Sequence, residues 1–255
     1  MSGATATTRG SRRGPGGRPL VIAHRGASGE LPENTLAAFE RAIEMRSDMI
    51  ETDLHLTRDG VVVIHHDASL ARLGGRGEIR DHDAASLFAL DASLGRGGFE
   101  RMPTLLDLLS RFGAQIEWNL ELKVGQRAPY EGLESVVLAE IEARGLLPRM
   151  LLSCFEDVVL ERLRAASPAA RLAVLVSARR PGRVLDRAAR VGAEAVNPHV
   201  SLVDRAFVES AHAGGLAVYP YTANDRAEMV RLLDCGVDGV ITNHPDRLRA
   251  LVDER

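Results

Sequence analysis

Carboxylate side chains close two of the short apolar runs in the chain. Glu51 and Asp53 end one run, and Glu121 ends a later one. Residues two apart on a strand point to the same side, so Glu51 and Asp53 should face one site. Grouped carboxylates repel unless a cation lies among them, and an all-oxygen set suits Mg²⁺ or Ca²⁺ rather than zinc. We therefore predict that Glu51, Asp53 and Glu121 bind one divalent cation; the alternative is ordinary strand-end polarity paired with arginines.

Histidines follow apolar runs in the same way. His24 ends the run that begins at Val21, and His65 and His66 follow a run that begins at Val61. The pKa of imidazole lies near neutral pH, which suits general acid–base catalysis. His24 is one candidate. Neighbouring residues on a strand face opposite sides, so the alternation pattern does not choose between His65 and His66.

Two cationic side chains adjoin these groups. Arg25 follows His24, and Lys123, the only lysine among 32 basic residues, follows Glu121 by two positions. Arginine and lysine are not interchangeable, because one is a planar fork and the other a compact point charge. Cations beside a metal site indicate an anionic substrate. A phosphoryl group fits, since the metal and the arginine neutralise its oxygens while histidines transfer protons.

The elements that must position these residues alternate between strand and helix. Strands are predicted at 20–23, 49–54, 116–122, 150–153, 172–177, 193–197, 216–219 and 239–241, and helices at 34–45, 104–112, 131–144, 157–166, 181–191, 204–213, 225–235 and 245–252. Eight such units favour an α/β fold of the (β/α)8 TIM-barrel type. No GxGxxG turn follows the first strand, which weighs against a dinucleotide-binding fold. A barrel gathers strand ends on one face, so the polar clusters should converge.

Two segments depart from this alternation. Residues 68–101, rich in Gly, Arg and Asp, are predicted to be a small insertion that serves as a lid or as part of a substrate pocket rather than as surface decoration. Residues 1–18 lack the apolar segment of a secretory signal and are predicted to be a disordered tail. The remaining residues, 19–255, are predicted to form one domain.

Composition limits the partners. The formal net charge of -3 provides no basic field for nucleic acid, and no apolar run approaches the roughly 18 residues of a membrane span. A soluble, cytoplasmic protein with a small-molecule substrate and no stable membrane insertion is expected. Cys154 and Cys235 have no metal-type spacing and are expected to be buried apolar residues.

Several motifs resemble those of the glycerophosphodiester phosphodiesterase family, in the family's order. They are His24-Arg25-Gly26, Pro32-Glu33-Asn34-Thr35, the run 51–60, His66-Asp67, Glu121-Leu122-Lys123 and the run 236–242. The resemblance runs from about Leu20 to the C-terminus. It implies a TIM barrel with a small insertion after the histidine–aspartate motif. It also implies metal-dependent hydrolysis of glycerophosphodiesters to sn-glycerol 3-phosphate and an alcohol.

The resemblance also assigns roles to residues. It implies that the second catalytic histidine is His66 and the first is His24. The implied metal ligands are Glu51, Asp53 and Glu121, and the predicted substrate-binding residues are Arg25, Lys123, Glu33, Asn34 and Tyr221. The stretch 33–35 is equally compatible with capping of the first helix.

Two positions depart from the family's pattern. Tyr221 stands where many members have tryptophan, and Asn243 stands where aspartate is common. Tyr221 is expected to wall the pocket. Asn243 lacks the charge and is expected to alter polar-group recognition while leaving the acid–base and metal positions untouched.

Alternative functions share the same residues. In the hydrolysis, a glycerol hydroxyl is expected to attack phosphorus and form a cyclic phosphate, which water then opens. Direct attack by water is the alternative. His24 is assigned as the base. One alternative is a lysophospholipase D or sphingomyelinase-like enzyme that acts on lipids. Another is a non-catalytic barrel that binds phosphodiesters. The sequence does not specify the head group, the native metal or the oligomeric state.

Overall fold

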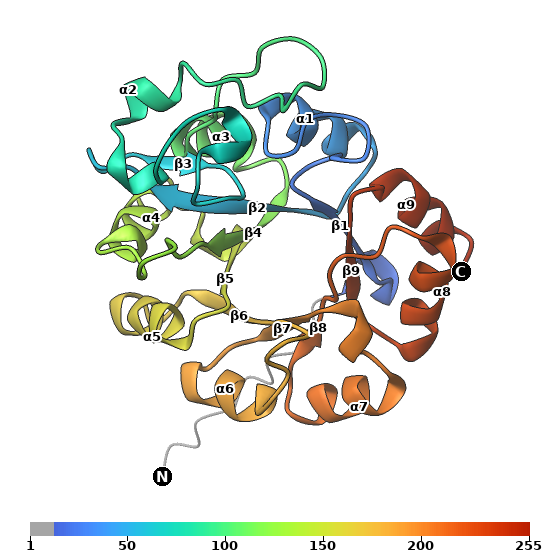
Figure 1. Cartoon of the computed structure of the whole chain (residues 1–255). Coiled ribbons are helices and arrows are strands. Elements are labelled where there is room, and N and C mark those ends of the chain that lie inside the picture. The colour runs from blue at the N-terminus through green and yellow to red at the C-terminus, as the bar shows by residue number, and fades with distance from the viewer. Residues whose placement is uncertain (1–12) are drawn as a thin grey trace.

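A ring of eight parallel strands forms the centre of the computed structural model, which describes residues 13–255 (Figure 1). The strands are β1 (Leu20–His24), β2 (Met49–Leu56), β4 (Glu117–Leu122), β5 (Met150–Cys154), β6 (Arg171–Val176), β7 (Ala195–Pro198), β8 (Ala217–Val218) and β9 (Gly239–Thr242). They pair in the order β8-β7-β6-β5-β4-β2-β1-β9. Backbone hydrogen bonds from Asp238 N to Val218 O (3.1 Å) and from Ile241 N to Pro220 O (2.9 Å) connect the two ends of this order. The predicted TIM barrel is therefore confirmed.

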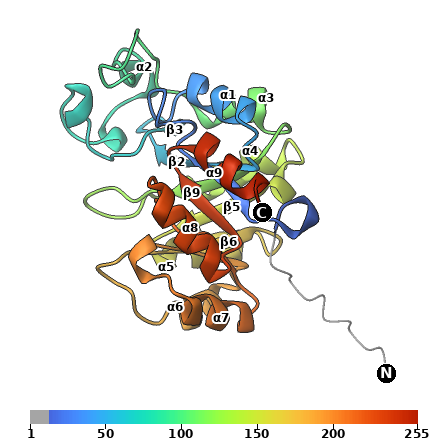
Figure 2. The same ribbon diagram turned by 90° about the vertical axis from the view of Figure 1, so that its right-hand side faces the viewer.

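Helices surround the ring on its outer side (Figures 1 and 2). They are α1 (Leu36–Glu44), α3 (Leu105–Phe112), α4 (Leu133–Glu142), α5 (Asp157–Ala166), α6 (Val184–Val191), α7 (Arg205–Ala213), α8 (Arg226–Cys235) and α9 (Pro245–Asp253). In the side view of Figure 2, α8 and α9 lie over β9, which both contact. Within residues 13–255, no helix combines the length and the apolar character that crossing a membrane would require.

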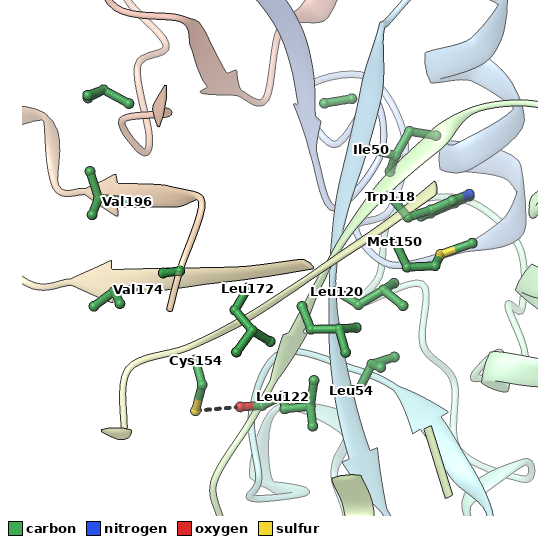
Figure 3. Packing of buried hydrophobic residues seen from close by; sticks show 14 of the residues in the cluster. Ile50, Leu54, Trp118, Leu120, Leu122, Met150, Cys154, Leu172, Val174 and Val196 are labelled. Atoms are coloured by element: carbon green, nitrogen blue, oxygen red, sulfur yellow. Dashed lines mark hydrogen bonds between the residues drawn. The ribbon is translucent and has the colours of Figure 1, made fainter. Parts of the chain in front are cut away.

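The main core lies between the outer face of the strands and the helices. Figure 3 shows side chains of this layer, among them Ile50, Leu54, Trp118, Leu120, Met150, Leu172, Val174 and Val196. The ring of Trp118 meets Phe39 of α1 edge to face, with centroids 5.2 Å apart, a favoured aromatic geometry. Cys154 is buried here and donates a hydrogen bond from Sγ to Leu122 O (3.1 Å).

The inside of the barrel changes from apolar to polar along the strands. Buried side chains fill its middle and form a second cluster that includes Ile22, Met49, Leu151, Tyr219 and Ile241. Successive inward-facing residues on a strand are two positions apart. Glu51 therefore follows Met49 on β2 and is followed by Asp53. Alternation thus carries the polar strand ends into the mouth of the barrel.

Helix starts differ from the sequence predictions where the backbone is left-handed. Helix α1 begins at Leu36 rather than at residue 34, because Asn34 has φ 59° and Thr35 is the N-cap, accepting a hydrogen bond from Ala38 N (3.1 Å). Helix α6 begins at Val184 rather than at residue 181, because Arg183 has φ 56°. Left-handed residues cannot continue an α-helix.

The apolar run at residues 61–65 forms a strand outside the ring. This strand, β3 (Val62–Ile64), pairs antiparallel with the far end of β2. The pairing returns the chain toward the barrel mouth. Residues 65–67, which follow β3, are therefore delivered to the same face as the ends of the parallel strands.

Residues 68–101 form a small unit beside the barrel mouth. Its short helices are η2 (Ala71–Leu73), η3 (Ile79–Asp81) and α2 (Ala84–Leu87), which stands outside the ring in Figure 1. A separate apolar cluster of Val63, Leu70, Ile79, Leu87, Ala92 and Met102 holds it together. Arg96 docks the unit by donating to Ser28 O (2.7 Å) and Leu31 O (2.9 Å). No residue of 68–101 lines the cavity described below, and the expected role as a lid or pocket wall stays a prediction.

The start of the described chain contacts the end of the barrel that lies opposite the mouth. Residues 1–12 of the predicted tail lie outside the described residues. Arg13 forms an ion pair with Asp238 (Nε to Oδ1, 3.0 Å) and donates to Gly236 O (2.9 Å). The last part of the segment that was predicted to be a tail is thus attached just before β9.

Candidate active site

Three carboxylates from neighbouring strands meet in the barrel mouth. Glu51 and Asp53 lie on β2 and Glu121 lies on β4, where Asp53 and Glu121 are register partners. One oxygen atom from each side chain lies within 4.8 Å of the other two. All three residues are buried. Their convergence, predicted from the alternation, follows from the parallel pairing of β2 with β4.

The charges of this triad fit a cation. Burial, followed by repulsion from Asp53 and Glu121, raises the pKa of Glu51 well above its usual value, and burial also raises the pKa of Glu121. Burial opposes ionisation of Asp53 too, but the charges of Lys123 and Arg25 outweigh it, so the pKa of Asp53 is lowered. Oδ1 of Asp53 accepts no hydrogen bond within residues 13–255. A hard divalent cation would satisfy these oxygens and relieve their repulsion.

Lys123 lies next to the triad. Its Nζ is 2.9 Å from Glu121 Oε1 and 3.4 Å from Asp53 Oδ1. Burial works against its charge, but these two carboxylates raise the pKa of Lys123 above the usual value. The ammonium group therefore stays charged at the edge of the cavity, where it can approach an anionic ligand.

Asn34 holds one of the three carboxylates in place. Its Nδ2 donates to Asp53 Oδ2 (2.8 Å), and its Oδ1 accepts from Thr52 Oγ1 (2.7 Å). The left-handed backbone of Asn34 allows this turn of the chain before α1. Asn34 does not line the cavity. In this structure Asn34 therefore contacts the triad residue Asp53 rather than the cavity.

His24 is held by the residue that follows β9. Nδ1 of His24 lies 2.6 Å from Oδ1 of Asn243, and Nε2 lies 3.8 Å from Glu51 Oε2. An amide oxygen can only accept, so the proton resides on Nδ1 and the lone pair of Nε2 faces the site. Burial, with a smaller effect of Arg25, lowers the pKa of His24 to about 4.

This contact corrects one expectation. Asn243 was expected to leave the acid–base positions untouched, but it hydrogen-bonds His24 directly. The cause is the strand order. β9 pairs with β1, and the partners Ala23 and Thr242 place the next residue of each strand side by side.

His66 reaches the cavity and His65 does not. Nδ1 of His66 lies 2.7 Å from Asp67 Oδ1, and Arg72 donates to the other oxygen of that carboxylate (3.0 Å). Burial lowers the pKa of His66, although Asp53 and the contact with Asp67 oppose the shift. His65 is buried, and its Nε2 has no partner in the described part of the chain. Of the two histidines, His66 is the one that lines the cavity, and the catalytic role that the resemblance implies for it stays a prediction.

Arg25 contacts Glu33, in the loop between β1 and α1, and Asp53 of the triad. It donates from Nη1 to Glu33 Oε2 (3.0 Å), and its Nε lies 3.3 Å from Asp53 Oδ2. Glu33 also accepts from Arg72 (3.1 Å) and does not line the cavity. Gly26 follows with φ 81°, and a Cβ atom there would lie 2.6 Å from the backbone carbon of Ala38. Only glycine permits this turn beside α1.

These groups line one cavity of about 170 Å³. Its wall is formed by His24, Arg25, Glu51, His66, Glu121, Lys123, Phe155, Leu175, Asn197, Tyr221, Thr222 and Ile241. Tyr221 walls it as expected, with its hydroxyl donating to Val176 O (3.2 Å) and its ring edge-on to Phe155 at 6.0 Å. Burial raises the pKa of Tyr221 to about 12.

Sequence reasoning missed several residues around the cavity. Asn197 ends a predicted strand, so its polarity at a strand end was an available signal. Phe155 and Leu175 resemble any other apolar residue near a strand end. Arg72 lies in the irregular segment 68–101, where no periodic pattern marks a functional side chain.

Known proteins are similar to this chain in sequence and in fold. A sequence profile of the Glycerophosphoryl diester phosphodiesterase family matches residues 24–247. A glycerophosphodiester phosphodiesterase of Bacillus subtilis is 32% identical, with 95% of this chain and 89% of the relative covered. A crystal structure of a putative glycerophosphoryl diester phosphodiesterase from Silicibacter pomeroyi superposes with a TM-score of 0.85 at 24% identity, covering 95% of each chain, and shows the same fold.

A phosphodiesterase of Oleispira antarctica has been solved in complex with the product sn-glycerol-3-phosphate. It is 33% identical, with a TM-score of 0.79 and coverage of 92% of this chain and 97% of that one. The family profile spans most of the chain, and the relatives match over nearly their full length. The chain belongs to the glycerophosphoryl diester phosphodiesterase family.

Proposed function

We propose that the protein hydrolyses glycerophosphodiesters to sn-glycerol 3-phosphate and an alcohol. The observation that carries the proposal is that two carboxylates of the oxygen triad, Glu51 and Glu121, line one cavity together with both candidate histidines and two cations. The relative from Bacillus subtilis bears the name of this activity, and the relative from Oleispira antarctica was solved with the product sn-glycerol-3-phosphate. These two likenesses support the substrate class.

The residues Glu51, Asp53 and Glu121 would hold one divalent cation, Mg²⁺ or Ca²⁺. When bound, such a cation neutralises phosphate charge and lowers the pKa of a hydroxyl group that contacts it. Arg25 and Lys123 approach different oxygens of Asp53, and both line the cavity. Their role in the proposal is to bind the non-bridging phosphate oxygens and so to orient the phosphorus atom.

The two histidines would transfer the protons. The 2-hydroxyl oxygen of the glycerol half forms a bond to phosphorus while the bond from phosphorus to the leaving alcohol breaks. His24 accepts the hydroxyl proton at Nε2, because Asn243 holds the proton on Nδ1. His66, whose protonated form is favoured by Asp67, gives its proton to the departing alkoxide. Water then opens the cyclic phosphate, with His66 taking the proton of water and His24 returning its own to the 2-hydroxyl.

A substrate panel tests the proposal. The metal-stripped enzyme is reloaded with Mg²⁺, Ca²⁺ or Mn²⁺ and given glycerophosphocholine, glycerophosphoethanolamine or lysophosphatidylcholine. The readout for all three is release of the alcohol, choline or ethanolamine, and for the two glycerophosphodiesters it is also release of sn-glycerol 3-phosphate. We expect release from the first two substrates and a loss of about 10²- to 10⁴-fold in turnover for His24→Ala or His66→Ala. Preference for lysophosphatidylcholine would favour the lipid-directed alternative. Binding of glycerophosphocholine without turnover would favour the non-catalytic alternative.

A further inference from the structure

Asn197 is a buried amide that the proposed reaction does not use. It lies on β7, is fully buried and lines the catalytic cavity. Neither its Nδ2 nor its Oδ1 has a hydrogen-bond partner within residues 13–255. Buried amides in proteins are nearly always hydrogen-bonded, because an unsatisfied one loses its hydration without compensation. A side chain of this kind, aimed into a cavity, indicates a polar ligand group.

The strand order places Asn197 opposite the carboxylates. In the order β8-β7-β6-β5-β4-β2-β1-β9, strand β7 lies across the ring from β2, which carries Glu51 and Asp53 (Figure 1). The wall around Asn197 also includes Leu175 on β6, Ile241 on β9, and Tyr221 and Thr222 after β8. The hydroxyl of Tyr221 donates to Val176 O. The cavity therefore has a charged side and a facing side without charged groups, on which Asn197 offers an amide with no protein partner within residues 13–255.

The cavity adjoins a wider groove, and the two spaces suit two different parts of a substrate. The volume of the cavity is about 170 Å³. One water molecule occupies roughly 30 Å³ in the liquid, so the cavity is large enough for a group of several heavy atoms. A wider groove of about 740 Å³ adjoins it through Phe155 and Leu175, which line both. The groove suits a leaving alcohol of variable size, whereas the cavity suits a small group that is the same in every substrate.

We propose that the amide of Asn197 binds the terminal hydroxyl of the glycerol half that the product retains. Nδ2 donates to the hydroxyl oxygen and Oδ1 accepts its proton, so both amide atoms and the hydroxyl are satisfied. The carbon atoms of the glycerol contact Leu175 and Ile241. The amide thereby makes the site selective for glycerol diesters over diesters whose retained alcohol lacks the terminal hydroxyl. This inference rests on the proposed function.

A matched substrate pair tests the role of Asn197. Glycerophosphocholine is compared with the corresponding propane-1,2-diol phosphocholine diester, which keeps the attacking 2-hydroxyl and lacks only the terminal one. For the metal-loaded wild type we expect kcat/KM to favour the glycerol substrate about fivefold, the ratio that one neutral hydrogen bond supplies. In Asn197→Leu the ratio should fall to about one, and in the control Ser201→Ala, on the chain just beyond β7, it should stay at the wild-type value. An unchanged ratio in Asn197→Leu would overturn the inference.

Two further measurements separate this role from a structural one. Because a partnerless buried amide gains nothing for the fold, Asn197→Leu should keep or raise the Tm of the wild type. A lower Tm with an unchanged substrate ratio would assign Asn197 to the fold and overturn the inference. Calorimetric titration with sn-glycerol 3-phosphate and with propane-1,2-diol 1-phosphate gives the same comparison without turnover. Binding that discriminates through Asn197 in a protein that turns over neither diester would overturn the proposed function alone.

Discussion

Nδ1 of His24 lies 2.6 Å from Oδ1 of Asn243, although the two residues are 219 positions apart in the chain. The contact joins the C-terminal ends of β1 and β9, the first and the last strand of the barrel. It fixes which nitrogen of His24 carries the proton and directs the other toward the carboxylates. Asn243 thus orients the imidazole through a neutral acceptor.

Replacing Asn243 should impair the proton transfer that is assigned to His24. Asn243→Ala removes the acceptor and frees the imidazole to rotate and change tautomer, so we expect kcat to fall about 10- to 100-fold with little change in KM. Asn243→Asp keeps an acceptor oxygen and should retain more activity than the alanine variant. Steady-state kinetics on glycerophosphocholine measures both. Equal activity of Asn243→Ala and the wild type would show that His24 needs no such support.

Arg72 should act as a positioning residue. Its Nη1 donates to Glu33 (3.1 Å) and to Asp67 (3.0 Å), and these carboxylates contact Arg25 and His66 respectively. We expect Arg72→Ala to lower kcat about tenfold and Arg72→Lys to restore part of the loss.

Arg96→Ala is the matched control for Arg72. Arg96 docks the same segment on backbone carbonyls of Ser28 and Leu31 without touching either carboxylate. If Arg96→Ala lowers kcat as much as Arg72→Ala does, then docking of the segment, rather than the charge contacts, accounts for the effect.

Metal binding should stabilise the fold as well as support turnover. A cation relieves the repulsion that raises the pKa of Glu51, so Mg²⁺ or Ca²⁺ at about 100 times its Kd should stabilise the stripped protein by about 2.7 kcal/mol. This stabilisation should appear as a rise in Tm when the cation is added, and Asp53→Asn should abolish that rise. Asp186→Asn, which changes an exposed carboxylate on α6, should preserve it. A rise in Tm that survives Asp53→Asn would place the cation elsewhere.

Gly26 should be far less replaceable than a glycine of the same backbone angle. Gly26 and Gly60 both have φ 81°, but a Cβ atom at Gly26 would lie 2.6 Å from Ala38, whereas nothing lies within 4 Å at Gly60. Gly60→Ala should lower the free energy of unfolding by about 1 kcal/mol through backbone strain alone. Gly26→Ala should lower it by about 3 kcal/mol, because the clash adds to the strain. Urea unfolding measures both, and equal losses would refute the contribution of the clash.

Alkaline pH should weaken the fold through its tyrosines. Burial raises the pKa of Tyr130 and of Tyr221 from 10.0 to about 12, and also raises that of Tyr219. The folded state holds these protons more tightly than the unfolded state, so stability is full below about pH 10 and falls as the pH rises toward about 12.

Two measurements check the tyrosine prediction. Urea unfolding at a series of pH values should show the loss, and Tyr221→Phe should reduce it. Ultraviolet titration should show little tyrosinate in the folded protein at pH 10.0, the ordinary pKa of the phenol. Half-ionised tyrosines at that pH without unfolding would contradict the prediction.

The sequence by itself determined the barrel and the polar residues at its mouth. Alternation along one strand is a local property with a period of two, so the shared facing of Glu51 and Asp53 could be predicted without knowledge of any neighbour. The repeated alternation of strands and helices predicted the (β/α)8 order.

The tertiary structure decided which of these residues touch. Contacts between different elements depend on strand order and register, which place residues distant in sequence side by side. The pairing of β9 with β1 brought Asn243 to His24, and the antiparallel strand β3 turned His66 rather than His65 to the cavity. Asn197 acquired its place opposite the carboxylates only when the ring closed, because a position across a barrel has no local signature in the chain.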